Sequence, residues 1–564
     1  MYKSNVKHCQ KELFDWDVVL PNKDRLHKSI WHTLRTQVFE KVDESRFKVL
    51  YPSSTGRPNS PINEILTLMT IKELFDWSFR ELESHMEWNF GLLYSCGVNI
   101  GESTVTLRTI TSFIKSLREY FDKTSIDLFD LEFNRLVKDH LKTFRVNTRI
   151  ARTDSTYINT NVCAYNRLQL QIEAIKRLYR ILEEDDKVKV SILCPDYIEY
   201  EADNYVSMLK TEEISGEFQN AGICFMNIID MVGDKYLKSE EWQEFIRIYQ
   251  EQFTIKQDND DGPKIEKKPS KEMTSNDIRG IDDPEATLRH KSGQNYLGFV
   301  GNVVETSDPE ADLNLICDAV LYKNNVSDGQ ILTDRIDDLV DNRLEKLDEI
   351  HFDGGYGGPE LDKKLKKHSV KSIQTGIRGV KCDVRMLVIE EADEYYASCV
   401  CQQKVRLQKT GKGYKAAFSP SVCSNCKKLN ECSVSYKEKN NEYVYYVNDN
   451  DLNKRIRLSN ISTIPEERRT IRSGVEATIH QFKCKTKANK SRLRGRYRHQ
   501  LWFQLAALAI NIKRIFNYTT NTPKNHESLG FSTFSSLFRP LLALIWDFEK
   551  QIGSFHRFQY FLSK

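Results

Sequence analysis

The chain has 564 residues, 40% of them hydrophobic and 29% charged, with a formal net charge of only +3. This length suggests about two to four domains with sizeable cores. No apolar run is long enough to span a membrane and the N-terminus carries no apolar signal segment, so we expect a cytosolic protein. The 13 cysteines are then expected to be reduced core residues or metal ligands, and not a disulfide framework.

Residues 1 to 145 are predicted to form an all-helical domain. A broad apolar stripe from Ile65 to Phe75 predicts one helix, and Ser78 with Glu81 forms a capping pattern for the next. Ser103-Thr104 is expected to open a third helix. Short helices with basic turns suit a DNA-binding domain, although such helices equally often form plain interaction bundles.

The period of the apolar residues changes from residue 146 onward. Residues 146 to 154 alternate and are rich in β-branched types, which predicts a strand that ends on Asp154-Ser155-Thr156. Residues 163 to 254 return to a helical pattern, as an insertion. Residues 255 to 280 are mostly Lys, Asp, Asn, Pro and Gly, and we expect a flexible linker there.

A second series of strands and helices follows the linker. The predicted order is a strand at 296–305, a strand at 313–322, a helix at 331–347, a strand at 350–353, a short helix, and a strand at 370–377. Strands mixed with helices in this order predict an α/β domain with a mixed sheet and flanking helices, formed by 146–380 and 456–516. Asp154 and Asp353 both end strands, where open α/β sheets carry their sites.

Glu476 lies on a helix that is predicted to begin after Thr463. Thr463 and Glu466 fit the pattern of a capping box at the start of this helix. One face of this helix carries four polar residues, and the neighbouring stripe is apolar and predicted to face the core. The polar residues are Arg472, Glu476, His480 and Lys483, and the apolar ones are Val475, Ile479 and Phe482. The helix therefore presents one carboxylate between cations.

A basic strip accompanies and follows this helix. From Ala477 to Gln500 there is no acidic residue, and eight residues are basic: Lys483, Lys485, Lys487, Lys490, Arg492, Arg494, Arg496 and Arg498. Charge runs are usually solvated faces, and that is the simpler interpretation. The other interpretation is a metal-bound acid next to a polyanion. An apolar helix at 501–515 and an aromatic tail at 517–564 come next, and we expect the tail to serve packing or an oligomer contact.

The segment 381–455 is a cysteine-rich insertion. It holds five of the 13 cysteines, namely Cys399, Cys401, Cys423, Cys426 and Cys432. The Cys423-x-x-Cys426 spacing is typical of a metal knuckle, and Cys432 with either Cys401 or Cys399 completes four thiolates. We therefore predict a structural zinc site with Cys401 as the preferred fourth ligand; the alternative is a set of scattered thiols without metal.

Taken together, these motifs resemble bacterial insertion-sequence transposases of the DDE class, and the resemblance extends over nearly the whole chain. The catalytic core carries it through Asp154-Ser155-Thr156, Asp353-Gly354-Gly355-Tyr356 and Arg472-x-x-x-Glu476 with Lys483. The N-terminal region carries it through Gly56-Arg57-Pro58, Ser78-x-Arg80-Glu81 and Ser103-Thr104. Two features depart from the family pattern: Arg469 stands where a tyrosine is usual, and the 163–280 insertion is atypical.

The resemblance implies a fold and a chemistry. The fold is an RNase H-like mixed sheet with an N-terminal helical domain and a cysteine-rich insertion before the third acid. Asp154, Asp353 and Glu476 would hold two Mg²⁺ or Mn²⁺ ions, as carboxylate oxygens suit these ions. The residues expected at DNA are Arg472, Lys483, Lys487, Lys490, Arg492, Arg494 and Tyr356.

The expected substrate is double-stranded DNA: the terminal inverted repeats of the protein's own element, and target DNA. The resemblance implies hydrolytic nicking followed by strand transfer, by a homodimer on DNA in the bacterial cytoplasm, at the nucleoid. Two other functions stay open at this point, an inactive transposase-derived DNA-binding protein and an RNase H-like nuclease of another role. Inverted repeats in the DNA that flanks the gene would favour the transposase.

Overall fold

The computed structural model describes residues 1–6, 16, 22–53, 55–99, 101–162, 165–258, 262–291, 293–374, 376, 385–391, 394–486 and 491–521. Residues Met1 to Tyr518 form one compact unit. Within it, helices precede a mixed sheet with helices around it, which confirms the predicted fold class. None of the described helices combines the length and the hydropathy that a membrane span needs. The aromatic tail predicted to aid packing lies almost wholly outside the described residues.

The N-terminal region is helical, as predicted. Its elements are α2 Lys23–His27, α3 Ile30–Leu34, η2 Arg35–Phe39, η3 Glu44–Leu50, α4 Ile62–Leu74, α5 Phe79–Trp88, α6 Phe90–Ser95, α7 Leu107–Thr124 and α8 Leu128–Thr143. The capping box of α5 is present: the Glu81 N–H donates to Ser78 Oγ at 3.2 Å, and the Ser78 N–H donates to Glu81 Oε2 at 2.7 Å. Helix α7 starts later than predicted, because Thr106 and not Ser103 is its N-cap.

The central sheet has the strand order β4-β5-β1-β7-β8, with β6 paired to β5. The strands are β1 Ile150–Asn159, β4 Thr287–Lys291, β5 Gln294–Thr306, β6 Ile316–Lys323, β7 Glu349–Phe352 and β8 Lys371–Gln374. β1 is antiparallel to β5 and parallel to β7, so the sheet is mixed as predicted. β1 does not end at Asp154 as expected: its ladder with β5 continues to Asn159.

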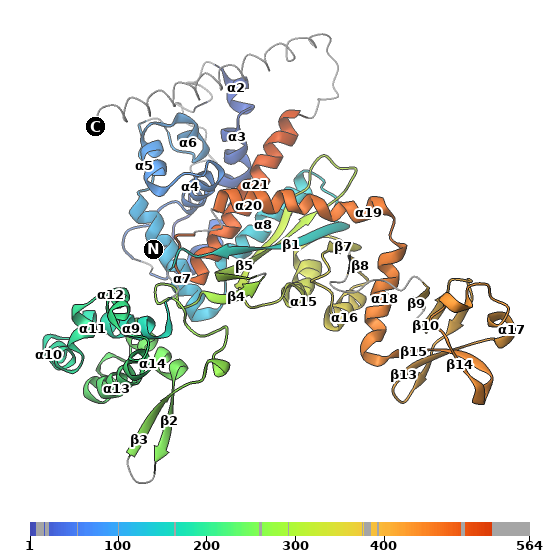
Figure 1. Cartoon of the computed structure of the whole chain (residues 1–564). Coiled ribbons are helices and arrows are strands. Elements are labelled where there is room, and N and C mark those ends of the chain that lie inside the picture. The colour runs from blue at the N-terminus through green and yellow to red at the C-terminus, as the bar shows by residue number, and fades with distance from the viewer. Residues whose placement is uncertain are drawn as a thin grey trace, which may run out of the picture. The chain divides into compact units, whose positions relative to one another are not determined.

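Helices cover both faces of this sheet (Figure 1). On one face, a Cβ at Gly301 of β5 would lie 2.6 Å from the ring of Phe503, so α21 (Arg496–Asn521) packs directly on the strand. On the other face, Val300 packs with Ile331 of α15 (Asp328–Asp338), which continues as η6 (Leu339–Arg343). α16 (Pro359–Lys367) joins β7 to β8. The predicted helix 331–347 is therefore shorter and starts earlier.

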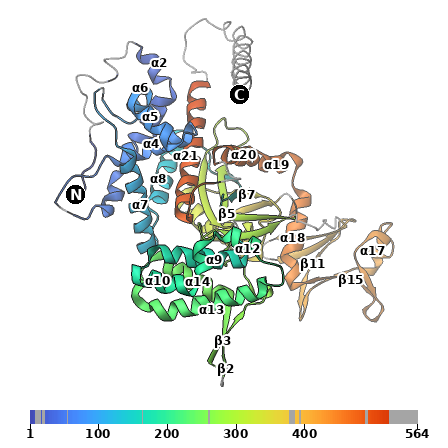
Figure 2. The same cartoon turned by 60° about the vertical axis from the view of Figure 1, so that its left-hand side comes forward.

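The insertion between β1 and β4 has a hydrophobic core of its own. Its helices are α9 Arg167–Ile181, α10 Glu184–Leu193, α11 Pro195–Glu199, α12 Ala202–Met208, α13 Ile214–Val232, η4 Gly233–Tyr236 and α14 Glu240–Gln252. The linker predicted at 255–280 is wrong over its first half, because β2 Phe253–Asp258 and β3 Gly262–Lys267 form an antiparallel hairpin (Figure 2). Ile265, Ile278 and Ile281 anchor this segment in the insertion's core.

The cysteine-rich insertion consists mainly of short strands with their own small core. The elements are β9 Met386–Glu391, β10 Glu394–Cys399, β11 Lys404–Arg406, β12 Gln408–Thr410, β13 Gly413–Phe418, α17 Pro420–Cys423, η7 Leu429–Glu431, β14 Ser435–Lys437, η8 Glu438–Asn440 and β15 Glu442–Asn448. Helix α18 (Asp449–Thr463) then contacts β8, β9 and β15, so it connects the insertion to the edge of the sheet.

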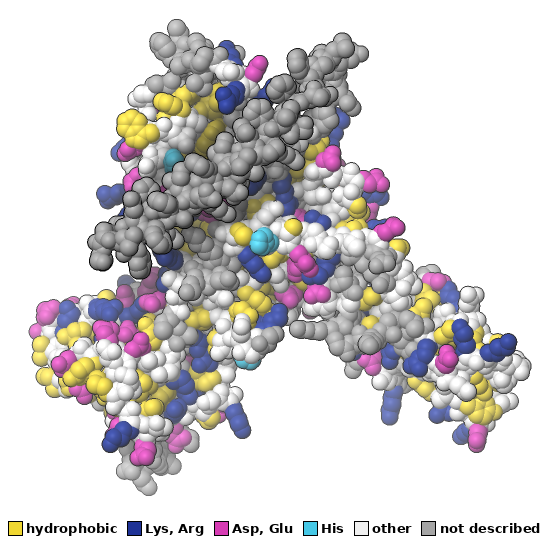
Figure 3. All heavy atoms as spheres, turned by 45° about the horizontal axis from the view of Figure 1, so that its top comes forward, with side chains coloured by type: hydrophobic (Ala, Val, Ile, Leu, Met, Phe, Trp, Pro, Cys, Tyr) yellow, Lys and Arg dark blue, Asp and Glu magenta, His cyan; other side chains and the backbone are white. Residues whose placement is uncertain are grey.

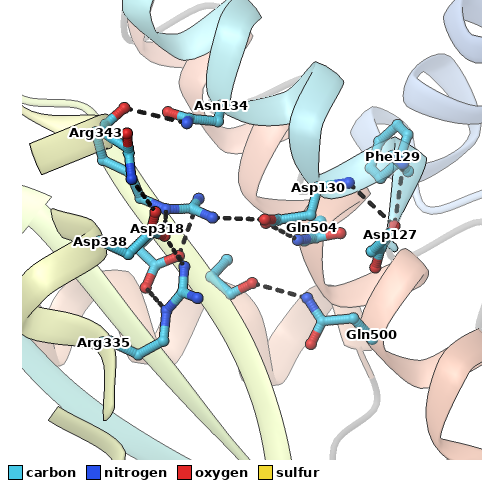
Figure 4. A network of polar contacts seen from close by, with 12 residues as sticks. Asp127, Phe129, Asp130, Asn134, Asp318, Arg335, Asp338, Arg343, Gln500 and Gln504 are labelled. Atoms are coloured by element: carbon cyan, nitrogen blue, oxygen red, sulfur yellow. Dashed lines mark hydrogen bonds and ion pairs between the residues drawn. The ribbon is translucent and has the colours of Figure 1, made fainter. Parts of the chain in front are cut away.

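A buried polar network joins the N-terminal helices to the sheet (Figure 4). Arg343 of η6 pairs with Asp130 of α8 at 2.6 Å and with Asp318 of β6 at 3.0 Å. Arg335 binds the same Asp318 carboxylate at 3.0 Å, and Gln504 of α21 donates to Asp130 at 2.6 Å. Because Asp318 is fully buried, its charge needs these two arginines.

Candidate active site

The first two predicted acids lie side by side at one end of the parallel strand pair. The register pairs Arg152 of β1 with His351 of β7. Continuing this register by two residues places Asp154 next to Asp353, which directly follows β7. Side chains two residues apart point to the same face of a strand, so Asp154 lies on the face covered by α21, and the Asp353 carboxylate is near enough to raise the pKa of Asp154. The prediction that these two acids share one site stays a prediction, with which this register is compatible.

The environment of Asp154 combines burial with charges of both signs. Burial raises the pKa of Asp154, the Ser155 N–H (2.9 Å) and Arg472 lower it, and the carboxylates of Asp353 and Asp328 raise it. The net direction is upward, so burial together with the two neighbouring acids outweighs the single arginine. Asp353 is more exposed and accepts a hydrogen bond from the Gly354 N–H at 2.6 Å.

The helix predicted to carry the third acid is interrupted. Instead of one helix from Thr463, the structure has α19 Glu466–Thr470, a 3₁₀ turn η9 Ile471–Ser473 and α20 Gly474–Thr486, and no side chain caps α19. The predicted core stripe is confirmed, because Val475, Ile479 and Phe482 are all buried.

Arg472, in the η9 turn, lies between two of the acids. Its Nη2 is 3.1 Å from Asp154 Oδ2, and its Nη1 is 3.4 Å from Glu476 Oε1. Glu476 itself is 62% exposed in its side chain, whereas Asp154 is 18% exposed. One guanidinium therefore links the acid of the sheet to the acid of the helix.

The described residues contain no group of three or more His, Cys, Asp or Glu side chains arranged to hold a metal ion. At the acids, the cation between Asp154 and Glu476 is the Arg472 guanidinium. The donor chemistry nevertheless fits Mg²⁺ or Mn²⁺, since all three side chains offer carboxylate oxygens and two of them face solvent.

Two further residues reach Asp154 from the opposite face of the sheet. Tyr356 was predicted to contact DNA, but it is 1% exposed, and its hydroxyl accepts a hydrogen bond from Asn302 Nδ2 at 2.7 Å. The same Asn302 amide lies 3.3 Å from the Asp154 carbonyl oxygen. Tyr356 therefore supports the strand at Asp154 from inside the protein and is not at the surface.

Sequence reasoning missed Asp328, the first residue of α15. Its Oδ1 accepts a hydrogen bond from Ser155 Oγ at 2.6 Å, and a Cβ at Gly355 would lie 3.4 Å from its Oδ2. Its charge therefore acts on Asp154 from the side away from Arg472. The only signal in the sequence was an acid after Ser327 at a helix start, which occurs at many helix N-termini.

Two acids, Asp283 and Glu285, lie near the basic strip in the folded protein, although no acid lies within the strip in sequence. Arg494 Nη1 binds Asn161 Oδ1 at 2.8 Å, and the Arg496 N–H donates to Glu285 Oε2 at 2.7 Å. Asp283, beside Gly495, is buried, and this burial raises its pKa to about 6. Arg492 and Lys483 are exposed, while Lys487 and Lys490 lie outside the described residues. Among the coloured side chains of Figure 3, basic and acidic groups are interspersed over the face shown.

The cysteines of the insertion lie in two segments, one at the end of β10 and one from α17 to just after η7. Cys401 Sγ is 2.7 Å from Cys426 Sγ, and the Cys426 N–H closes a turn onto the Cys423 carbonyl at 3.0 Å. Burial raises the pKa of Cys423, and the thiolates of Cys399, Cys432 and Cys426 raise it further. The Cys399 thiol also raises the pKa values of Cys401 and Cys432. The thiols of Cys399, Cys426 and Cys432 therefore all act on Cys423, and thiols are donors that zinc prefers, but no three cysteines among the described residues are arranged as a metal site.

Comparisons with protein families find two matches in the chain. Residues 398–516 match the transposase DDE domain, and residues 20–116 match the transposase domain DUF772. The resemblance to insertion-sequence transposases of the DDE class is confirmed. The matched segments contain the five cysteines of the insertion, Glu476 and most of the N-terminal helices, whereas Asp154 and Asp353 lie outside them. Comparison with curated proteins and with solved structures found no match. The DDE domain supports a nucleotidyl-transfer and endonuclease class of enzyme, and this family generally uses divalent metal ions.

Proposed function

We propose that the chain is the transposase of an insertion sequence, and that Asp154, Asp353 and Glu476 form its active site. The observation that carries the proposal is the convergence of remote segments. The β1–β7 register brings Asp154 beside Asp353, and Arg472 connects Asp154 to Glu476 across 3.1 and 3.4 Å. Acids that gather from distant parts of a chain next to a basic segment suit phosphodiester chemistry.

The three carboxylates would hold two Mg²⁺ or Mn²⁺ ions, which supply charge stabilisation at the phosphodiester. The protein's own part is to place these oxygens: the Ser155 N–H fixes one oxygen of Asp154, and the Gly354 N–H fixes one of Asp353. When Asp154 and Glu476 bind metal ions, the planar guanidinium of Arg472 would be available to bind a phosphate through two parallel hydrogen bonds. The exposed Lys483 ammonium would bind a phosphate as a single positive charge.

The reaction proceeds in two displacements at the same site. In the first, a water oxygen bonds to phosphorus at the end of the element while the bond from phosphorus to the 3′ oxygen breaks. This leaves a 3′-hydroxyl and a 5′-phosphate. In the second, that 3′-hydroxyl attacks a phosphodiester of the target DNA, and the target's own 3′ oxygen leaves. One site serves both steps because each nucleophile is an oxygen that carries a proton, of water in the first step and of the 3′-hydroxyl in the second.

The other parts of the chain serve this chemistry. The N-terminal helices and the strip with Lys487, Lys490, Arg492 and Arg494 bind double-stranded DNA, namely the terminal inverted repeats and the target. Two copies act together on the DNA, in the bacterial cytoplasm. A zinc ion on Cys423, Cys426, Cys432 and Cys401 stabilises the insertion, and Cys399→Ser compared with Cys401→Ser would decide the fourth ligand by zinc content.

The decisive experiment is Mg²⁺-dependent nicking of a DNA fragment that carries the element's own end. Asp154→Asn, Asp353→Asn and Glu476→Gln should each lower nicking by at least about a thousandfold, and the triple variant should be little worse, because residues that act as a unit are not additive. Asp348→Asn is a matched control: this half-buried acid lies just before β7 and pairs with Arg149.

Band-shift affinity for the same fragment should stay close to wild type in all these variants, since an amide keeps the shape of the carboxylate. If the Glu476→Gln protein nicks at the wild-type rate, α20 is not part of the active site. A wild-type protein that binds the end and never nicks it would favour the inactive DNA-binding protein.

A further inference from the structure

Glu305 is a fully buried carboxylate near the end of β5, with hydrogen-bond partners on three other elements. It accepts from Arg152 Nε of β1 at 2.7 Å and from Arg514 Nη1 of α21 at 2.7 Å. It also accepts from Thr478 Oγ1 of α20, which lies 3.0 and 2.9 Å from its two oxygens. Since both oxygens are engaged and the side chain is 0% exposed, this carboxylate is held in one place.

Arg152, one of the two arginines that bind Glu305, also contacts the η9 turn, which contains Arg472. Arg152 Nη1 donates to the Ile471 carbonyl at 3.0 Å. A Cβ at Gly474 would lie only 2.0 Å from the same Nη1, so any side chain at this position would displace the guanidinium. The η9 turn and the first residue of α20 thus rest directly on the Arg152–Glu305 pair.

The position of α20 decides where two functional groups of the candidate site lie. Arg472 precedes Gly474, and Glu476 follows it within the first turn of α20. Glu476 is exposed, and its one contact in the described site is the 3.4 Å approach of Arg472. The position of its carboxylate therefore depends on the helix, and the helix depends on Glu305.

We propose that Glu305 is the positioning residue of the active site: through Arg152 and Thr478 it sets α20 so that Arg472 and Glu476 face Asp154. This inference rests on the proposed function. It assigns Glu305 no contact with DNA or with a reacting atom, because the side chain is buried behind α20.

A second buried carboxylate in the same sheet provides the control. Asp318 is 0% exposed like Glu305, and it too is held by two arginines, Arg335 and Arg343. These arginines belong to α15 and η6 and not to α20 (Figure 4). A loss of stability common to buried carboxylates affects both variants, whereas a displacement of α20 affects only the variant at Glu305.

The test compares Glu305→Gln with Asp318→Asn in the full chain, and the nicking rate of each variant is expressed per amount of folded protein. We expect Glu305→Gln to lower nicking about a hundredfold at saturating DNA, because a misplacement of about 1 Å can cost that much. Asp318→Asn should stay within about threefold of wild type. Thr478→Val, which removes one donor and no charge, should lie between them, and it keeps the test informative if Glu305→Gln does not fold.

Hydrogen exchange supplies a measurement that does not depend on activity. Glu305→Gln should speed exchange across 474–486, whereas Asp318→Asn should speed it in α15 and leave 474–486 unchanged. Equal losses of nicking in the two variants, or unchanged exchange of α20 in Glu305→Gln, would overturn the proposal. If wild-type protein does not nick, the proposed function fails, and the exchange comparison still decides whether Glu305 positions α20.

Discussion

The acid site and the thiol cluster assemble their donor atoms in different ways. The three acids come from β1, from the end of β7 and from α20, and a guanidinium already lies between two of them. The five thiols all come from one small insertion: Cys399 and Cys401 from the end of β10 and the turn after it, and Cys423, Cys426 and Cys432 from the segment that runs from α17 to just after η7. The arrangement of the acids therefore depends on the whole fold, whereas the thiol cluster is local, and the zinc ion proposed for it would contribute to the folding of the insertion.

The largest effect should follow from losing the metal of the thiol cluster. Cys423→Ser should remove about one zinc ion per chain and unfold the insertion, because zinc on four thiolates contributes on the order of 10 kcal/mol to folding. Zinc content and limited proteolysis over 385–463 measure both effects. Cys484→Ser, at an exposed cysteine on α20, should change neither. A zinc-free wild-type protein with an ordered insertion would contradict the difference between the two sites.

The next largest effect concerns the cation of the acid site. Arg472→Ala should lower nicking about a hundredfold, in the range for removing one charge-stabilising donor. Because Arg472 lowers the pKa of Asp154, its loss raises that pKa, and the acid limb of the pH–rate profile should move to higher pH. Arg472→Lys should lower the rate but keep the limb near its wild-type position, since it keeps the charge and loses the fork. If the acid limb of the pH–rate profile does not move in Arg472→Ala, Arg472 does not act on the pKa of Asp154 during catalysis.

A smaller effect concerns the basic strip, which is proposed to bind the DNA backbone, in contrast to the thiol cluster. Replacing Lys487, Lys490, Arg492 and Arg494 by Ala should lower the slope of log affinity against log salt by about 0.9 for each phosphate that these side chains bind in the wild-type complex. The affinity should fall by a similar factor for all DNA sequences. Cys423→Ser, by contrast, should keep the slope of wild type. If the quadruple variant also keeps it, the strip is a solvated face, and its contacts with Asn161 and Glu285 are its whole role.

The smallest effect should come from Asp328, and it has the opposite sign to that of Arg472. Asp328 raises the pKa of Asp154, so Asp328→Asn should lower that pKa and move the acid limb of nicking to lower pH. Ser155→Ala removes the hydrogen bond to Asp328 and keeps the charge, so its limb should stay in place. A shift to higher pH in Asp328→Asn would mean that its charge does not act on Asp154 during catalysis.

The sequence predicted the parts of the acid site that depend on local pattern. Alternating residues predicted β1, a short strand was predicted at 350–353, where β7 lies, and the apolar stripe of Val475, Ile479 and Phe482 predicted the buried face of α20. The break at Ile471–Gly474 was missed, because it depends on Arg152 from a strand 319 residues earlier in the chain. The capping box predicted at Thr463 was wrong, since that residue instead ends α18.

Contacts between remote segments explain the other differences. Tyr356 was predicted at the DNA because it follows Asp353, yet Asn302 of β5 holds it inside. The strip was predicted to be uncompensated because no acid lies within it, yet Glu285 and Asp283 approach Gly495 and Arg496 from more than 200 residues away. Neither approach leaves a local pattern in the sequence, since each depends on how strands and helices meet.

The distance along the chain between β1 and the elements that complete its face has a consequence for synthesis. Arg152 leaves the ribosome 153 residues before Glu305 and 319 residues before Ile471. At about 5–20 residues per second, the second interval lasts roughly 15–60 s. The helical insertion has its own core and can fold during this time, whereas the acids stay apart until α20 emerges. The three acids of the candidate site therefore come together only late in the synthesis of the chain.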